Sequence, residues 1–193
     1  NGLGVNVMLN SAVSEIFWRE IQLKSGEKIP SEVTIWAAGV KPSEQAQVLH
    51  LPTISGRVEV NQNLSVVNYP YIWAVGDISG AKDEKGKFFP MVAPVAMQQG
   101  RFVAEQILRY EKNQPLPEFK YRDKGSMATI GRHKAVVQVN KIGFAGIAAW
   151  YVWLWLHLFY LAGIKNRLST MIDWTFNYLT FDRGNRHIMD GYE

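Results

Sequence analysis

The chain of 193 residues contains no cysteine. This absence excludes disulfides, thiolate metal ligands and cysteine nucleophiles. The four histidines are scattered without the paired spacing of a zinc site, so no metal site is predicted: His50, His133, His157 and His187. Stripes of Arg and Lys interleaved with stacking aromatics are also missing, which argues against nucleic acid as a partner.

Charged residues are missing from residues 142–164. As a helix this segment would extend roughly 35 Å, enough to cross a bilayer. It is apolar on every side, which is typical of a helix that is deeply buried or in contact with lipid. Its Trp and Tyr residues are spread through its middle, and basic residues flank both ends (Lys134, Lys141, Lys165 and Arg167). This pattern favours a helix lying in the membrane interface, with a spanning helix as the alternative.

A second helix is predicted over residues 168–181, capped by Asp182-Arg183-Gly184 and joined to the first around residues 165–167. The two helices would form a hairpin-like foot. The alternatives are a dimer interface or a core completed by another part of the protein. The net charge of +4 is compatible with an anionic lipid surface but is not specific for one.

Alternating or continuous apolar runs predict short strands in the rest of the chain. The expected strands are residues 5–9, 13–18, 21–23, 29–30, 33–39, 58–60, 64–67, 72–75, 127–130 and 135–139. A short helical piece is expected near residues 44–49, and a longer helix over residues 94–112. Pro94 suits the first position of that helix because its missing N–H costs nothing there.

The run at residues 72–75 ends in Gly76 and Asp77. It is interpreted as a buried strand whose terminal carboxylate lies at the carboxyl edge of a sheet, where open α/β sheets bind ligands. A glycine lets a cofactor approach the backbone, and an aspartate accepts hydrogen bonds from sugar or ribitol hydroxyls. An ordinary turn is the alternative.

The start of the helix at Pro94 offers a second candidate contact for a cofactor. Free N–H groups near Val95 and Ala96, together with the helix dipole, would stabilise an anionic reduced flavin. Gln98 could donate from its amide to a quinone carbonyl, whereas Gln98 and Gln99 cannot both face the same way. The alternatives are an ordinary helix start and a solvated polar pair.

These segments, in this order, resemble the C-terminal half of type II NADH dehydrogenases, which are single-subunit NADH:quinone oxidoreductases. The matching segments are Thr34-Ile35-Trp36-Ala37-Ala38-Gly39-Val40, Ala74-Val75-Gly76-Asp77, Ala93-Pro94-Val95-Ala96-Met97-Gln98-Gln99-Gly100-Arg101, Asp123-Lys124-Gly125-Ser126-Met127-Ala128-Thr129-Ile130-Gly131-Arg132 and Tyr178-Leu179-Thr180-Phe181-Asp182-Arg183-Gly184. The resemblance implies an α+β fold: an incomplete two-dinucleotide-binding-domain flavoprotein fragment with a small β unit and C-terminal amphipathic or hydrophobic helices. It divides the chain into the end of an NADH-binding domain (residues 1–60), part of an FAD-binding domain (61–117) and a membrane-docking domain (118–193).

The resemblance also assigns roles to residues. The cofactor-binding residues are Gly76, Asp77, Val95 and Ala96, which would contact FAD, and Ala38 and Gly39, which would close the nicotinamide domain near both cofactors. The quinone entrance is lined by Ala93, Pro94, Met97 and Gln98. Membrane contact falls to Trp150, Trp153, Trp155, Tyr160 and Trp174. The implied partners are NADH, a quinone, the membrane surface and a second copy in a homodimer, and the implied location is peripheral, on the cytoplasmic face of the inner membrane.

The chain departs from the family pattern in two respects. Many members carry Gln where this chain has Pro94, so a two-glutamine quinone clamp is not available. Both Gly-rich phosphate loops are absent, and so is the acidic residue for the NADH ribose, so the chain alone is expected to be inactive. The alternatives are a membrane-binding and dimerisation module, or part of another FAD-dependent pyridine-nucleotide oxidoreductase, although the cysteine pairs of disulfide reductases are missing.

Overall fold

The computed structural model describes residues 4–180. Its strands are β1 (Val13–Phe17), β2 (Glu20–Leu23), β3 (Lys28–Pro30), β4 (Thr53–Ile54), β5 (Arg57–Val58), β6 (Ser65–Val66), β7 (Tyr69–Trp73), β8 (Ser126–Thr129), β9 (Ala135–Val139) and β10 (Ile142–Gly146). Its helices are α1 (Gln45–Val48), the 3-10 turn η1 (Gly76–Ile78), α2 (Ala93–Glu111), α3 (Ile147–Tyr160) and α4 (Ile164–Thr180). Small sheets and helices are thus mixed, and the predicted α+β class is confirmed.

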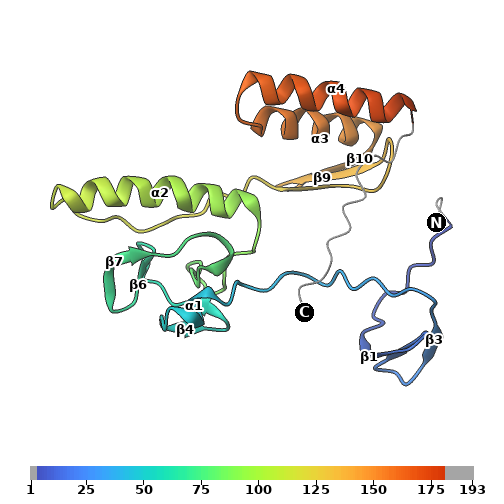
Figure 1. Ribbon diagram of the computed structural model, residues 1–193, viewed down its shortest axis with the longest axis horizontal. Coiled ribbons are helices and arrows are strands. Elements are labelled where there is room, and N and C mark those ends of the chain that lie inside the picture. Colours follow the sequence, from blue (N-terminus) through green and yellow to red (C-terminus); the bar gives the residue numbers. More distant parts are fainter. Residues whose placement is uncertain (1–3, 181–193) are drawn as a thin grey trace.

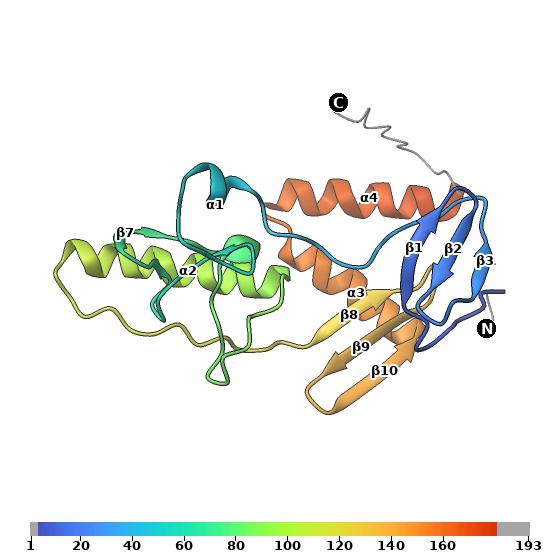
Figure 2. The ribbon, with the colours of Figure 1, turned by 90° about the horizontal axis from the view of Figure 1, so that it is seen from below.

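Four small antiparallel sheets organise the described part of the chain. Two have three strands, in the orders β1-β2-β3 and β10-β9-β8, and two have two strands, β4-β5 and β6-β7. Figure 1 shows the β1–β3 sheet at one end of the molecule, joined to α1 by an extended connector, residues 31–42. Figure 2 shows the same connector from below, running from β3 to α1.

Two of the predicted strands are wrong. Residues 5–9 and residues 33–39 adopt no regular strand. Val33, Ile35 and Trp36 have strongly β-prone side chains, yet all three are exposed. A strand needs a hydrogen-bonded neighbour, and within residues 4–180 no segment pairs with residues 33–39. Propensity alone therefore does not make a strand here.

The helix predicted over residues 142–164 is correct only over residues 147–160, which form α3. Residues 142–146 form β10, which pairs with β9 from Ile142 opposite Val139 to Gly146 opposite Ala135. Asn140, at φ 53°, helps to close the tight turn between the two strands. Gly146, at φ 89°, then redirects the chain into α3, which has 14 residues. An apolar run does not by itself distinguish strand from helix.

The two C-terminal helices pack against each other, and α3 lies on the β8–β10 sheet, between the sheet and α4 in the view of Figure 1. Their connection is residues 161–163, a few residues before the predicted position, and Gly163 takes a φ of 81° there. The predicted helix pair is therefore confirmed, with a shorter first helix. Within residues 4–180, no helix combines the length and apolarity that crossing a bilayer requires. The predicted cap at Asp182-Arg183-Gly184 lies outside the described residues.

Three small clusters of buried residues form the core. The first joins Ala46, Val58, Val66 and Ala74. The second joins Leu64, Ala81 and Val103, so that it links the end of β7 to α2. The third joins Ala135, Val137 and Ala149 and fixes α3 on the β8–β10 sheet. The second cluster positions the candidate site, because it holds α2 against the segment that follows β7.

Candidate functional site

The segment after β7 turns at Gly76, as the sequence suggested, but β7 is not a buried strand. Tyr71 and Ile72 are exposed, because β7 pairs only with the short β6 in a two-stranded sheet. The buried part comes after the strand, at Ala74. Gly76 has a φ of 72°, and a Cβ atom built there would lie 3.3 Å from the Cβ of Ala96. A glycine is thus required both by the backbone conformation and by the close approach of α2.

Gln99 holds this turn in place, a role that the sequence did not reveal. Its side chain is 1% exposed, and its Oε1 accepts a 2.6 Å hydrogen bond from the backbone N–H of Gly76. Val95, Val103 and Gln106 are the other buried residues of α2. The signal was present, because residues 95, 99 and 103 follow helical spacing and place Gln99 on the buried face. Gln99 is therefore the side chain that joins α2 to the turn at Gly76.

The start of α2 differs from the prediction. The N–H groups of Val95 and Ala96 are not free, because both donate to the carbonyl of Val92, at 3.0 and 3.3 Å. The extended Val92 serves as N-cap, and Pro94 lies in the first turn as expected. An i–3 bond of this kind commonly tightens the first turn of a helix. The positive end of the helix dipole still lies here, but these two N–H groups are not available to a ligand in this structure.

Asp77 and the residues of the 31–42 connector have different surroundings. Asp77 is exposed, and its carboxylate forms no hydrogen bond or ion pair within residues 4–180. It lies one residue from Gly76, so the close contact with Ala96 holds it beside α2. Ala38 and Gly39 are exposed in the connector, outside η1 and α2. The structure thus unites Gly76, Asp77, Val95 and Ala96.

Gln98 faces away from Gly76 and fixes another segment. Its Nε2 donates to the carbonyl of Arg122 (2.9 Å), and its Oε1 accepts from the N–H of Arg122 (3.0 Å). These two bonds hold the backbone of Arg122 against α2. Ala93 and Met97, also predicted at the quinone entrance, are exposed on the same helix.

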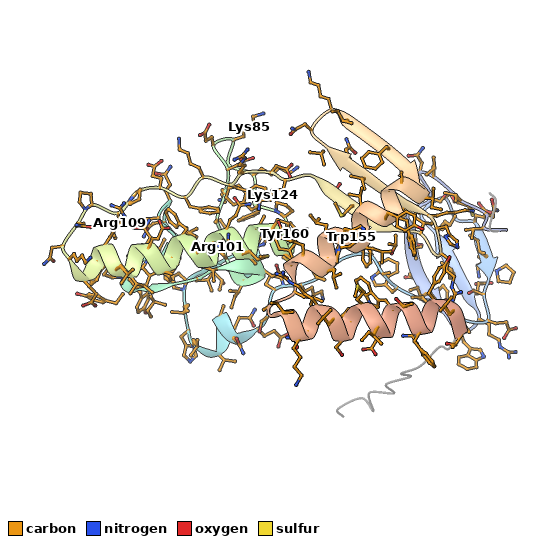
Figure 3. All side chains as sticks on the ribbon, turned by 90° about the horizontal axis from the view of Figure 1, so that it is seen from above. Lys85, Arg101, Arg109, Lys124, Trp155 and Tyr160 are labelled. Atoms are coloured by element: carbon orange, nitrogen blue, oxygen red, sulfur yellow. The ribbon has the colours of Figure 1, made fainter. Side chains whose placement is uncertain are left out.

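The predicted membrane-contacting aromatics fall into two groups. Trp150, Trp153 and Trp174 are half-buried, and Trp153 stacks on Trp174 between the two helices with ring centroids 6.0 Å apart. Trp155 and Tyr160 are exposed, and Tyr160 accepts a 3.4 Å hydrogen bond from Nζ of Lys124. Figure 3 shows Lys124 and Tyr160 next to each other, with Trp155 farther along α3.

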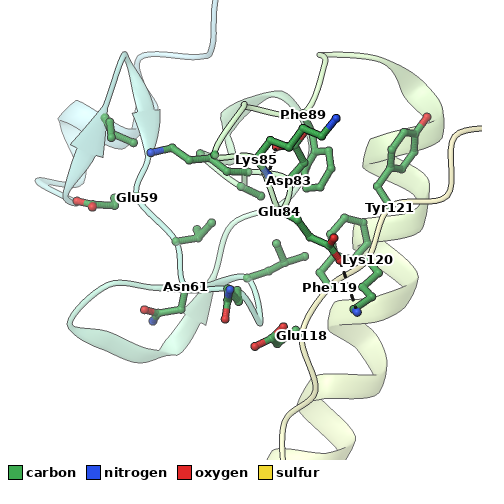
Figure 4. Close-up of a pocket in the computed structure, with 18 residues that line it drawn as sticks. Glu59, Asn61, Asp83, Glu84, Lys85, Phe89, Glu118, Phe119, Lys120 and Tyr121 are labelled. Atoms are coloured by element: carbon green, nitrogen blue, oxygen red, sulfur yellow. Dashed lines mark hydrogen bonds and ion pairs between the residues drawn. The ribbon is translucent and has the colours of Figure 1, made fainter.

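A separate crevice of about 710 Å³ lies between residues 59–62, the 80–87 loop and residues 118–121 (Figure 4). Acidic and basic side chains share its walls, and Lys120 pairs with Glu84 at 3.7 Å. Burial, and after it the nearby Asp123 carboxylate, raise the pKa of the Tyr121 phenol on this wall. None of the predicted site residues lines the crevice, so it is distinct from the turn at Gly76.

Comparison with known families gives two matches. Residues 1–100 match the model described as pyridine nucleotide-disulphide oxidoreductase. Residues 124–183 match the model described as NDH2 C-terminal domain.

Individual relatives agree with these matches. The type II NADH:quinone oxidoreductase Ndh of Mycobacterium tuberculosis is 35% identical over 202 residues, covering 97% of this chain and 42% of that protein. The mitochondrial internal alternative NAD(P)H-ubiquinone oxidoreductase A1 of Solanum tuberosum is 30% identical, with coverage of 80% and 35%. This chain thus spans less than half the length of these relatives. The solved NDH2 of Plasmodium falciparum, in complex with NADH, shares the fold with a TM-score of 0.75 at 17% identity, covering 92% of this chain and 52% of that one.

Proposed function

We propose that this chain, which belongs to the pyridine nucleotide-disulphide oxidoreductase family, forms the C-terminal part of a type II NADH:quinone oxidoreductase. In such an enzyme a bound FAD would supply the chemistry that takes a hydride from NADH and delivers two electrons to a quinone. The sequence similarity to enzymes with this name over 97% of the chain supports the proposal. Because the chain spans only part of their length, the activity is proposed for the whole protein.

The observation that carries the proposal is the free carboxylate of Asp77. An exposed carboxylate with no protein partner in the described residues can accept hydrogen bonds from the hydroxyls of a bound ribitol chain. Gln99 fixes the turn that presents it, and Ala96 approaches that turn closely. The residues present therefore fit one wall of an FAD site. The backbone of Val95 and Ala96 and the methyl group of Ala96 would form more of this wall. Ala38 and Gly39 would close the NADH side.

The same proposal extends to the quinone and the membrane. Ala93, Pro94, Met97 and Gln98 lie on the first turns of α2 and would line the quinone entrance, with Gln98 acting through the segment that it holds. We propose that Trp155 and Tyr160 contact lipid, whereas Trp150, Trp153 and Trp174 maintain the helix pair. A peripheral protein on the cytoplasmic face of the inner membrane, working in the respiratory chain as a homodimer, is the corresponding expectation.

The test is Asp77→Asn in the full-length protein. We expect loss of bound FAD, measured as the ratio of flavin to protein absorbance, together with loss of NADH oxidation by a water-soluble quinone. Asp173→Asn is the matched control, because Asp173 is an exposed aspartate of α4, in the C-terminal unit. Full flavin content in Asp77→Asn, or wild-type protein that oxidises no NADH, would contradict the proposal.

A further inference from the structure

The crevice of about 710 Å³ is lined by none of the residues proposed for FAD or the quinone. Its walls are joined to the rest of the fold by backbone hydrogen bonds. The N–H of Phe119 donates to the carbonyl of Gln62 (2.8 Å), and the N–H of Gly80 donates to the carbonyl of Val58 (2.8 Å). The crevice is therefore a fixed feature of the fold, and its volume is typical of a pocket for a small molecule.

One wall of the crevice is a small hairpin. Lys82 and Phe88 pair in an antiparallel bridge at its base. Asp83 closes the turn, because its Oδ1 accepts 2.9 Å hydrogen bonds from the N–H groups of Lys85 and Lys87. The Asp83 carboxylate thus orders the hairpin, which brings Lys82 and Lys85 to the crevice.

The lysines that line the crevice differ in their partners. Lys120 pairs with Glu84 at 3.7 Å, so that these two charges satisfy each other (Figure 4). Lys82 and Lys85 form no ion pair within residues 4–180. Lysine ammonium groups are common partners of phosphate oxygens. An anionic group of a ligand could therefore bind at the hairpin without breaking an ion pair of the protein.

The other two walls carry carboxylates. Glu59 and Glu118 line the crevice, and neither forms an ion pair in the part of the chain that the structure describes. An ionised carboxylate accepts hydrogen bonds and donates none. These two walls therefore favour the hydroxyl or amino groups of a ligand and disfavour a second anionic group.

Aromatic side chains complete the lining. The Phe89 ring meets the rings of Phe119 and Tyr121 edge to face, with centroids 5.7 and 5.6 Å apart. We call these three rings the aromatic wall. Leu64 and Ala81, which are buried, add further apolar surface. A flat ring of a ligand can pack against such a surface.

We propose that the crevice binds a mononucleotide whose base carries an amino group, such as adenosine monophosphate (AMP). Its phosphate meets Lys82 and Lys85, and its base packs on the aromatic wall. The ribose hydroxyls and the base amino group donate to Glu59 and Glu118. Inorganic phosphate would use only the two lysines, and an apolar ligand would leave all four charged groups unpaired. The inference goes beyond the proposed function, because it concerns a different set of residues.

The experiment is titration calorimetry of the full-length protein with AMP, adenosine, uridine monophosphate (UMP) and inorganic phosphate. AMP should bind more tightly than adenosine, which lacks the phosphate, and than UMP, whose base has no amino group. The double variant Lys82→Gln with Lys85→Gln should weaken AMP binding about tenfold, because two charge-assisted contacts are lost, and should leave adenosine binding unchanged. The matched control, Lys24→Gln with Lys112→Gln, changes two exposed lysines outside the crevice.

Several outcomes would overturn the inference. Equal affinity for AMP and inorganic phosphate would show a phosphate site only, and equal AMP affinity in the two double variants would exclude the hairpin lysines. Displacement of AMP by NAD⁺, with no effect of the lysine variant, would place AMP in the NADH-binding site. Flavin absorbance checks that each variant is folded. If the lysine variant loses its flavin, Glu118→Gln is the second test, and an undiminished preference for AMP over UMP would contradict the inference.

Discussion

Among single residues, Gly76 combines two constraints that can be measured separately. Its φ of 72° disfavours any side chain, and an added Cβ would meet Ala96 at 3.3 Å. We expect Gly76→Ala to lower the free energy of unfolding by about 1–2 kcal/mol for the backbone alone, plus a further loss from crowding. Gly86→Ala is the control, because Gly86 has a φ of 75° and no neighbour within 4 Å. Urea unfolding measures both, and equal losses would show that the contact with Ala96 is unimportant.

Gln99 and Gln98 are adjacent glutamines with opposite surroundings. Replacing Gln99 with Leu leaves the Gly76 N–H without its acceptor in a part-buried site, so we expect a loss of about 1–3 kcal/mol in the free energy of unfolding. Gln98→Leu removes two bonds to Arg122 that lie at the exposed surface, where water can replace them, and should cost less. Denaturant titration compares the two variants. A larger loss in Gln98→Leu would contradict the role given to Gln99.

Tyr121 gives the chain a pH dependence on the alkaline side. Burial raises the pKa of its phenol, so the folded state keeps the proton that the unfolded state loses as pH rises above the usual value of about 10. Stability should therefore fall as pH rises from there through the folded pKa. Tyr121→Phe should remove this part of the alkaline decline, measured by thermal unfolding between neutral pH and the alkaline range. An unchanged alkaline decline in Tyr121→Phe would show that the Tyr121 phenol does not cause it.

Among the helices and strands, α2, β8 and β9 were predictable, whereas β10 and the unpaired residues 33–39 were not. The sequence located α2 within one residue at each end, because Pro94 and apolar residues at helical spacing suffice. It also located β8 and β9, which are neighbours in the chain. It failed at β10, where Gly143 and Gly146 should have argued against a continuous helix, and at residues 33–39, whose strand would need a partner outside the described chain. An apolar run that does not distinguish strand from helix explains the first failure, and the lack of a pairing partner within the described residues explains the second.

The candidate site was predictable in its residue types but not in its hydrogen bonds. Gly76, Asp77 and the start of α2 follow from a strand, a Gly-Asp pair and a helix in sequence. That Gln99 faces inward to Gly76 while Gln98 binds Arg122 depends on where α2 packs, which only the tertiary structure decides. The amide bonds of Val95 and Ala96 to Val92 are likewise a property of the folded first turn.

The connection between α3 and α4 depends on Arg167. Its guanidinium donates to two carbonyls at the end of α3, where a cation also suits the helix dipole. We expect Arg167→Met to speed hydrogen exchange in the last turn of α3, with a loss of about 1–2 kcal/mol in its local stability. Lys165→Met is the control, since it removes a neighbouring cation that contacts no carbonyl within the described residues. Equal exchange in the two variants would exclude the capping role.

For the whole molecule, the exposed connector relates this chain to its longer relatives. Trp36 in the connector and Trp155 in α3 are similarly exposed, at 64% and 68%, but only Trp155 lies in hydrogen-bonded helix. Proteases cut extended backbone, so chymotrypsin should cut after Trp36 well before Trp155 in this chain. The relatives have more than twice as many residues as this chain. In a full-length protein of that size we expect a neighbouring strand to pair with residues 33–39 and to protect Trp36. Mass spectrometry of timed digests would measure both, and equal cleavage at Trp36 in the short and the full-length protein would show that this segment stays unpaired.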